Sequence, residues 1–287
     1  NKLNFFIFLM ATRIQSPSSI NTYKRCPRKY YYEYILGLES LPSIHIIRGK
    51  ITHSTLEDFF KIDISFINQE HHEFELNVLL NNLLKKHWDN SQKELEELKL
   101  EKKEIDFYFR ETIAMLDNWF RNFIKRLNKE LEKNTSLEEA FNVIKPITEA
   151  HIISHKHMIQ GFMDTIYKKP DGVFIIDYKT SKIPEITQEY RLQLAIYSLL
   201  YYEKYGVKPK KVGIDFLRHN IKFIDVDEQL MDFARQECKL IQEKTKSENI
   251  EDYPIQYSNL CKHSHDCCKY YERLIQQSKL KEFISKG

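Results

Sequence analysis

The chain has 287 residues, of which 42% are hydrophobic and 13% aromatic, so it can bury a sizeable core and is globular. Its 44 basic and 41 acidic residues leave a net charge of +3, which excludes a histone-like polyanion binder and confines any nucleic-acid surface to a local patch. Five cysteines, an odd number concentrated near the C-terminus, do not form the even framework of a small secreted protein. We therefore expect a reducing, cytoplasmic location.

The first nine residues contain the apolar run Phe5–Leu9, which is too short for a membrane span and lacks a small-residue cleavage site. Met10 is a candidate initiator, which would make residues 1–9 an upstream extension and residues 10–287 the folded chain. No later stretch is apolar enough to cross a membrane, so we expect no membrane association.

Capping hydroxyls at residues 16–19 predict a helix that is interrupted near Cys26-Pro27 and ends at Gly37. Its basic residues alternate with aromatic ones, and two interpretations stay open. The alternation is suited to phosphate contacts and base stacking, and it also fits an ordinary amphipathic helix with a solvated basic face. The basic residues are Lys24, Arg25, Arg28 and Lys29.

A second helix is predicted from Arg48-Gly49-Lys50 through Phe60, with His53 in its first turn. A lone histidine on a helix is more often structural than functional. Residues 72–134 are charged, poor in glycine and proline, and carry apolar residues at helical spacing, which predicts two or three helices. We expect this block to be an accessory helical layer that shapes access to a site without supplying chemistry.

From Phe141 the pattern favours strands, the first over Val143–Ile153. Glu149 on this strand could add a carboxylate to a site, although an exposed strand glutamate is the simpler expectation. Residues 158–179 then form two apolar, β-rich runs around Lys169-Pro170-Asp171-Gly172, which predicts an antiparallel hairpin.

Counting outward from a turn at Pro170 and Asp171 places Asp164 opposite Asp177, and strand alternation places Lys179 on the face of Asp177. Opposed carboxylates destabilise a sheet unless a cation compensates them, and a divalent metal does so economically. Two acidic metal ligands beside a lysine suit metal-assisted phosphodiester hydrolysis. An ordinary hairpin with an exposed aspartate pair is the alternative.

A helix follows Pro184 and Thr187 and ends at Gly206. Gln193 and Tyr197 share one of its faces and could point toward the carboxylates, with a surface glutamine and a core tyrosine as the alternative. Another hairpin is predicted over Val212–Leu217 and Ile221–Val226, and a final helix over Asp227–Lys244. The order of elements indicates a mixed α/β fold.

Several of these motifs together resemble the PD-(D/E)XK nuclease superfamily, in its RecB-type branch, which includes AddB-like and CRISPR-associated exonucleases. The resemblance covers most of the chain, in the family's order. It is carried by Ser18-Ser19-Ile20-Asn21-Thr22-Tyr23-Lys24-Arg25-Cys26-Pro27, Gly49-Lys50-Ile51-Thr52-His53, Gly161-Phe162-Met163-Asp164, Ile175-Ile176-Asp177-Tyr178-Lys179-Thr180, Gln193-Leu194-Ala195-Ile196-Tyr197, and a cysteine cluster near the end.

The resemblance implies a mixed central β-sheet flanked by helices, the restriction-endonuclease-like core, as one domain over residues 10–287 with a helical insertion at 72–134. It implies that His53 binds Mg²⁺ or Mn²⁺ together with Asp164 and Asp177. The same resemblance makes Lys179, Asp164 and Asp177 catalytic. Substrate contacts would fall to Gln193 and Tyr197.

The cysteine-containing end, residues 255–272, resembles the iron–sulfur segment of some RecB-type nucleases, in which one N-terminal cysteine joins three near the C-terminus. Cys26 and Cys261 match this pattern, but Ser264 stands where a thiolate is expected. Cys267 and Cys268 could complete a [4Fe-4S] site in altered spacing. A zinc site using His263 or His265, or a metal-free remnant, stays open. In each case we expect this end to lie against Cys26 as a clasp.

The leading hypothesis is a Mg²⁺- or Mn²⁺-dependent DNA nuclease, exonucleolytic by analogy, acting on single strands or duplex ends in repair, recombination or mobile-element defence. Its partners would be helicase, recombination or CRISPR-associated proteins. The alternative is a catalytically inactive, nuclease-like DNA-binding or assembly module. Intact Asp164, Asp177 and Lys179 argue against the alternative, because a binding module has no need for opposed carboxylates.

Overall fold

The computed structural model describes residues 13–256 and 266–285. The chain divides into two compact units, each built from separate stretches of sequence. The first unit contains residues 1–41, 152–161 and 228–287, and the second contains residues 42–151 and 162–227. The second unit holds the helical block and most of the sheet, and the two units are described in turn.

One five-stranded sheet is present in the described part of the chain, with its strands in sequence order. β2 and β3 are antiparallel, β3 and β4 are parallel, and β4 and β5 are antiparallel. The mixed sheet with flanking helices confirms the predicted fold class. The strands are β1 (Ile147–Ser154), β2 (Ile159–Lys169), β3 (Gly172–Lys179), β4 (Lys211–Phe216) and β5 (Ile221–Asp225).

The β2–β3 hairpin turns at Pro170 and Asp171 as predicted, because Lys169 pairs with Gly172. Gly172 has a φ of +135°, and a Cβ at this position would lie 2.9 Å from the Cβ of Lys210, so a glycine is required. The ladder ends where Thr165 pairs with Ile176. Asp164 and Asp177 therefore stand one residue beyond the last pair.

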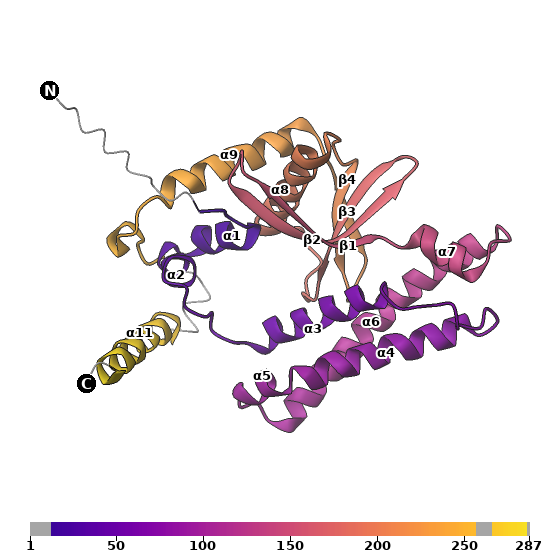
Figure 1. Cartoon of the computed structure of the whole chain (residues 1–287), viewed down its shortest axis with the longest axis horizontal. Helices are drawn as coiled ribbons and strands as arrows, with labels where there is room; N and C mark the ends of the chain where they lie inside the picture. Colours follow the sequence, from indigo (N-terminus) through magenta and orange to yellow (C-terminus); the bar gives the residue numbers. More distant parts are fainter. Residues whose placement is uncertain (1–12, 257–265, 286–287) are drawn as a thin grey trace. The chain divides into compact units, whose positions relative to one another are not determined.

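Helix α8 (Gln188–Tyr205) forms the crossover between β3 and β4. Thr187 caps its first turn, and Gly206 ends it in the left-handed region with a φ of +69°, as predicted. Its buried side chains include Leu192, Ala195 and Leu199. Figure 1 shows α8 beside β4, and the hydrogen bond from Gln193 to Asp177 brings the first two turns of this helix close to the carboxyl end of β3.

The other helices of the second unit pack together through a large apolar core. Phe59, Phe60, Trp119, Phe123 and Phe141 form its aromatic centre, with neighbouring ring centroids 5.1–6.3 Å apart. Tyr178 of β3 belongs to the same core, so this helical layer covers part of the sheet. The helices are α3 (Ile44–Phe59), α4 (His72–Asn90), α5 (Gln92–Glu97), α6 (Lys102–Leu131) and α7 (Leu137–Ile144).

Two predicted boundaries in this unit are wrong. Helix α3 begins at Ile44, capped by Ser43, so His53 lies in the middle of the helix and not in its first turn. The region from Phe141 to Ile144 is helical, because Ser136 and Glu139 form a capping box that starts α7, and the strand begins only at Ile147. In both cases a serine caps a helix that begins upstream of the predicted boundary.

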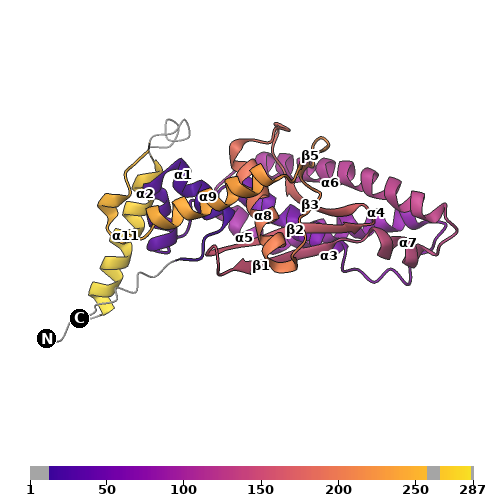
Figure 2. The ribbon, with the colours of Figure 1, turned by 90° about the horizontal axis from the view of Figure 1, so that it is seen from above.

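The first unit is built around tyrosines. The helix after Ser16 is interrupted at Cys26 as predicted, and the tyrosines of this segment stack on one another and on Tyr253 and Tyr271. Figure 2 shows α1, α2, α9 and α11, which belong to this unit. Its elements are α1 (Pro17–Arg25), α2 (Pro27–Tyr30), the π-helix η1 (Tyr31–Ile35), α9 (Glu228–Lys244), the 3₁₀-helix η2 (Ile250–Asp252) and α11 (Asp266–Ser285).

These contacts favour the structural interpretation of the basic N-terminal helix. Tyr30 and Tyr32 are buried, Lys24 forms an ion pair with Glu237, and Arg28 donates to the Tyr253 carbonyl at 2.7 Å. The prediction that the helix ending at Lys244 is the final one is wrong, because α11 follows it. Tyr271 of α11 stacks on Tyr32 at 4.9 Å and donates to Glu33 at 2.6 Å.

The predicted cysteine site falls partly outside the described residues. Cys26 is buried and Cys268 is half-buried. Cys261 lies outside the described range, as does the side chain of Cys267. Contacts of Tyr271 and Tyr253 with the segment after Cys26 nevertheless bring the two ends of this unit together. Among the described helices, none is long and apolar enough to span a membrane.

Candidate active site

Asp164 is held in a fixed orientation at the point where β2 leaves β3. Its Oδ2 accepts a hydrogen bond of 2.7 Å from the backbone N–H of Tyr178, and its Oδ1 lies 3.1 Å from His53 Nδ1. The side chain occupies the place where the ladder would continue, so the carboxylate replaces a backbone carbonyl as the acceptor. Asp164 is 8% exposed, and these two contacts fix the orientation of its carboxylate.

Asp177 lies on β3 with both carboxylate oxygens engaged. Its Oδ2 is 2.5 Å from Lys179 Nζ, and its Oδ1 accepts a 2.9 Å hydrogen bond from Gln193 Nε2. Gln193 also donates to the hydroxyl of Tyr197 at 2.8 Å, and that hydroxyl is 3.5 Å from Asp177 Oδ1. The shared face predicted for Gln193 and Tyr197 thus points at Asp177, and Tyr197 is buried against it.

His53 reaches the hairpin from α3. Its Nδ1 faces Asp164, and its Nε2 lies 2.9 Å from the carbonyl oxygen of Tyr178. Both neighbours are acceptors, so the doubly protonated ring satisfies both contacts. Binding of a metal by either nitrogen requires that nitrogen to lose its proton.

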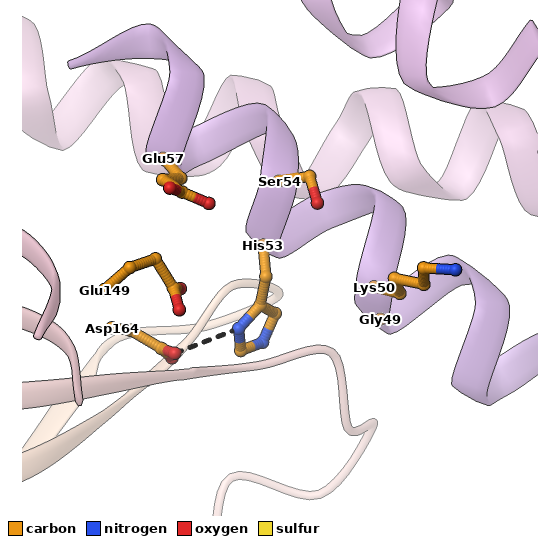
Figure 3. Close-up of a pocket in the computed structure, with 7 residues that line it drawn as sticks. All are labelled: Gly49, Lys50, His53, Ser54, Glu57, Glu149 and Asp164. Atoms are coloured by element: carbon orange, nitrogen blue, oxygen red, sulfur yellow. Dashed lines mark hydrogen bonds and ion pairs between the residues drawn. The ribbon is translucent and has the colours of Figure 1, made fainter. Parts of the chain in front are cut away.

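Glu149 joins this group from β1, where its φ of +48° departs from strand geometry. One ligand atom each from His53, Glu149 and Asp164 lies within 4.8 Å of the others. They line a cavity of about 310 Å³ together with Gly49, Lys50, Ser54 and Glu57 (Figure 3). A left-handed conformation in a non-glycine residue costs about 1–2 kcal/mol, so the backbone is strained where it brings this carboxylate to the site.

The charges of the site are strongly coupled. Burial raises the pKa of Asp177, and the repulsion from Asp164 adds to this effect despite the attraction of Lys179. For Asp164, burial acts in the same direction but is outweighed by His53, Lys179 and the Tyr178 N–H, so its pKa is lowered. Burial lowers the pKa of His53, yet Asp164 more than compensates and the pKa is raised.

The pKa values of Glu149 and Lys179 are also shifted by their surroundings. Burial, with a further contribution from the charges of Asp164 and Glu57, raises the pKa of Glu149 to about 7, so this carboxylate is costly to ionise without a nearby cation. Burial lowers the pKa of Lys179, but the charges of Asp177 and Asp164 raise it by more. The net pKa is therefore raised, and the ammonium stays charged. The site therefore favours an added cation beside a permanently charged lysine.

The donor set fits a divalent metal. Carboxylate oxygens suit Mg²⁺ and Mn²⁺, and an imidazole nitrogen is also a common ligand of transition metals. His53, Asp164 and Glu149 supply one nitrogen and carboxylate oxygens at mutual distances that one ion can bridge. Asp177 is outside this group in the described structure, and its two oxygens contact Lys179 and Gln193 instead.

The structure brings together most of the predicted site residues. Asp164 and Asp177 follow from the hairpin register, and His53, Lys179, Gln193 and Tyr197 contact one or the other. Glu149, for which an exposed position was the simpler expectation, is half-buried and belongs to the ligand group. A charged residue within a β-forming stretch was the only sign in the sequence that Glu149 belongs to the site. Its positive φ could not be predicted. In the described residues the cysteines join no metal-ligand group.

Similar proteins were found by two of three comparisons. A search of curated proteins finds no match. A crystal structure from Eubacterium rectale, described as a "Putative exonuclease", matches with a TM-score of 0.50 and 13% identity, covering 92% of this chain and 94% of the other. At this identity the match shows a shared fold.

The family comparison covers nearly the whole chain. The model of the PD-(D/E)XK nuclease superfamily matches residues 15–273, a range that contains α3, the β2–β3 hairpin and α8. Asp164, Asp177 and Lys179 all lie in the matched range, at the end of the hairpin where the resemblance places the family's acidic pair and lysine. The chain belongs to the PD-(D/E)XK nuclease superfamily.

Proposed function

We propose that this protein is a Mg²⁺- or Mn²⁺-dependent nuclease that hydrolyses phosphodiester bonds in DNA. One observation carries the proposal: His53, Glu149 and Asp164 gather within metal-ligand distance while the charged Lys179 lies against Asp177. A structural role does not explain this arrangement, because it places three carboxylates near one another at a cost in stability. Membership of a nuclease superfamily supports the same conclusion.

Each residue has a role that its contacts support. His53, Asp164 and Glu149 would hold the metal, with Asp177 as the carboxylate between this group and Lys179. A bound divalent cation would activate water and neutralise charge on the phosphate. Lys179 keeps its positive charge and would stabilise the negative charge that develops on the phosphate, or hold the attacking water.

Gln193 and Tyr197 are assigned to positioning rather than to the substrate contacts that the resemblance implies. Gln193 donates one amide hydrogen bond to Asp177, and the Tyr197 hydroxyl lies 2.8 Å from Gln193 Nε2 and 3.5 Å from Asp177 Oδ1. Together they fix the orientation of the Asp177 carboxylate, which otherwise would be repelled by Asp164. Neither residue lines the cavity beside His53.

The finer features of the activity belong to this proposal. We propose exonucleolytic cleavage at single-stranded or duplex DNA ends, in repair, recombination or mobile-element defence, with helicase, recombination or CRISPR-associated partners. This follows from the RecB-type motifs, and the similar structure described as a "Putative exonuclease" is consistent with it. For Cys26, Cys261, Cys267 and Cys268 an iron–sulfur cluster is proposed, with a zinc site or a metal-free remnant as the alternatives. Anaerobic purification with iron and zinc analysis distinguishes the three.

Cleavage assays on a small panel of substrates test the proposal. The purified protein is incubated with end-labelled linear single-stranded DNA, linear duplex and circular DNA, each with Mg²⁺, Mn²⁺ or EDTA. We expect cleavage of linear DNA with a metal and none in EDTA. Degradation of linear but not circular DNA supports the exonuclease, whereas cutting of circular DNA contradicts that mode. An absence of cleavage with either metal contradicts the enzymatic proposal itself.

A further inference from the structure

A second cavity, of about 480 Å³, has Lys179 in its lining. It is lined by three cationic residues, two tyrosines, a histidine and two hydroxyl residues, and its lining contains no carboxylate. Its volume is within the range of roughly 300–1,000 Å³ that is typical of small-molecule sites. The residues are His45, Arg48, Tyr108, Lys179, Thr180, Ser181, Lys182 and Tyr190.

Positive charge is built into one wall of this cavity. Arg48 is 2% exposed and forms an ion pair of 2.7 Å with Glu111. The same carboxylate receives two hydrogen bonds from Arg218, at 2.8 and 2.9 Å. One glutamate therefore neutralises two guanidinium groups, and one positive charge is left over. Within the described residues, the buried Arg48 Nε has no hydrogen-bond partner, so this guanidinium retains unused donor capacity.

The pKa of the neighbouring His45 is lowered, in part by this positive charge. His45 lies at the same cavity, and burial together with Arg48, Lys182 and Arg218 lowers its pKa, although Glu111 acts in the opposite direction. Several cations thus act on one small volume. Such a volume attracts an anion, and the group next to Lys179 in the proposed reaction is a phosphate.

Two aromatic rings complete the cavity. Tyr108 comes from α6, and Tyr190 comes from the first turn of α8. Arg48 lies over the ring of Tyr108 at 5.3 Å, and Lys179 over the ring of Tyr190 at 5.4 Å. Both side chains are half-buried, so each is held in place and still presents some surface. A tyrosine in a cationic groove is the usual device for stacking an unpaired base.

The backbone of residues 180–182, which line the cavity, is held in place by hydrogen bonds. Arg218 Nε donates to the Thr180 carbonyl at 3.2 Å, and a ring nitrogen of His219 lies 2.8 Å from the Lys182 carbonyl. The loop that follows the catalytic Lys179 is therefore tied to the β4–β5 turn. Through Glu111, the helical insertion holds Arg48 and Arg218 in place and so supports the same loop.

From this juxtaposition we infer that the cavity binds one unpaired nucleotide next to the scissile phosphate, with its base on Tyr108 and its phosphate toward Arg48 and Lys182. The inference rests on the proposed function and names its substrate as single-stranded DNA or a frayed end. A base that stays stacked in a duplex cannot reach a tyrosine in a cavity of this size. The helical insertion, through Tyr108, thus takes part in substrate binding.

Binding without cleavage tests the inference. In EDTA, the fluorescence anisotropy of a labelled oligothymidylate is compared with that of a blunt duplex of equal length. We expect Tyr108→Leu to weaken single-strand binding roughly tenfold, since base stacking on an aromatic ring is worth a few kcal/mol at most, and to leave duplex binding unchanged. Tyr108→Phe should retain wild-type affinity. Phe74→Leu, an exposed aromatic on α4 outside the cavity, is the matched control.

The phosphate contact has its own readout. Lys182→Ala should reduce the slope of log affinity against log salt by about 0.7, the contribution of one phosphate in a single strand. Lys208→Ala, an exposed lysine outside the cavity, should change neither affinity nor slope by this amount. Equal effects of Lys182→Ala and Lys208→Ala would contradict the phosphate assignment.

The outcomes separate this inference from the proposed function. If the wild type cleaves DNA while Tyr108→Leu binds oligothymidylate normally, or loses single-strand and duplex binding equally, the inference is wrong and the nuclease stands. If binding depends on Tyr108 as expected but no metal supports cleavage, the cavity stands as a single-strand site and the proposed enzymatic function is wrong.

Discussion

The backbone conformation of one residue, Glu149, decides whether the site has two nearby carboxylates or three. In regular strand geometry its side chain would follow the alternation of β1. A φ of +48° interrupts that alternation, and the carboxylate comes within metal-ligand distance of Asp164 and His53. The strain is therefore located at the residue whose position the proposed metal site requires.

Replacing Glu149 by glutamine should separate stability from metal binding. Glu149→Gln removes a carboxylate whose pKa is raised to about 7 by burial and by Asp164 and Glu57, so the metal-free protein should melt at a higher temperature near pH 8. It also removes a ligand, so Mn²⁺ should bind roughly tenfold more weakly or worse. Thermal melting with and without Mn²⁺ measures both effects.

Glu57→Gln is the matched control, because Glu57 lines the same cavity but is not in the ligand group. Its Mn²⁺-induced rise in melting temperature should stay near that of the wild type. An unchanged rise in Glu149→Gln would show that Glu149 is not a ligand.

At the residue level, the sequence was informative where strand rules apply. A two-residue turn at Pro170 and Asp171 fixes the register, so Asp164, Asp177 and Lys179 could be assigned to one end of the hairpin. Glu149 could not be assigned, because a positive φ in a non-glycine residue leaves no pattern in the sequence. Arg48 and Tyr108 were also missed, since their common cavity joins residues that are far apart in the chain.

The β2–β3 hairpin is the element that positions the carboxylates, and its turn depends on Gly172. An alanine there would need a φ of +135° and would bring its Cβ within 2.9 Å of the Lys210 side chain. We expect Gly172→Ala to lower the free energy of unfolding by on the order of 2 kcal/mol, measured by urea denaturation.

Gly206→Ala provides the comparison. Gly206 also has a positive φ, +69°, but a Cβ there would meet no atom within 4 Å. Its substitution should cost only about 1 kcal/mol, the usual penalty at a helix C-cap. Equal losses for the two variants would mean that the contact with Lys210 has no energetic weight.

Element types were predictable where the pattern is long or strongly capped. The helical block at 72–134 became α4, α5 and α6, and α8 ends at Gly206 as expected. The start of α3 was misplaced, because Ser43 caps a helix whose first turn contains the β-branched Ile44, Ile46 and Ile47. Helix α7 was not predicted, since it has only eight residues and lies directly before the β-forming pattern of β1. The block's contribution of Tyr108 and Glu111 could not be predicted, since it depends on tertiary packing.

At the scale of the whole molecule, stability should depend on pH through a buried carboxyl that the active site does not use. Asp215 on β4 is 8% exposed, and burial raises its pKa to about 6 although Arg126 acts against this. The folded form thus holds its proton more tightly than the unfolded chain, whose ordinary pKa is 3.8. Stability is lost as the pH rises from about 4 to above 6.

Asp215→Asn should remove this loss. Relative to the wild type, the variant should gain little near pH 4 and up to about 3 kcal/mol above pH 7, because two pKa units correspond to about 2.7 kcal/mol. Urea unfolding at the two pH values measures the difference. A gain that is the same at both values would show that the effect is not ionisation of Asp215.

The organisation of the whole chain was only partly predictable. The mixed sheet follows from the order of helices and strands, and the superfamily follows from motifs that retain their order. The division into two units could not be predicted from the sequence, because the first unit is assembled from three separate stretches, residues 1–41, 152–161 and 228–287. Helix α11 could not be predicted, because no apolar periodicity marks it clearly.

The central claim is that Asp177 and Lys179, with the carboxylates around His53, form a metal-dependent nuclease site. It is tested most directly by measuring cleavage of end-labelled linear DNA in Mn²⁺ by the wild type, Asp177→Asn and Lys179→Ala, with melting curves to establish that all three are folded. We predict metal-dependent cleavage by the wild type and at least a hundredfold slower cleavage by each folded variant, as is typical when a group that stabilises the transition state is removed. Cleavage by either folded variant at the wild-type rate would contradict the account.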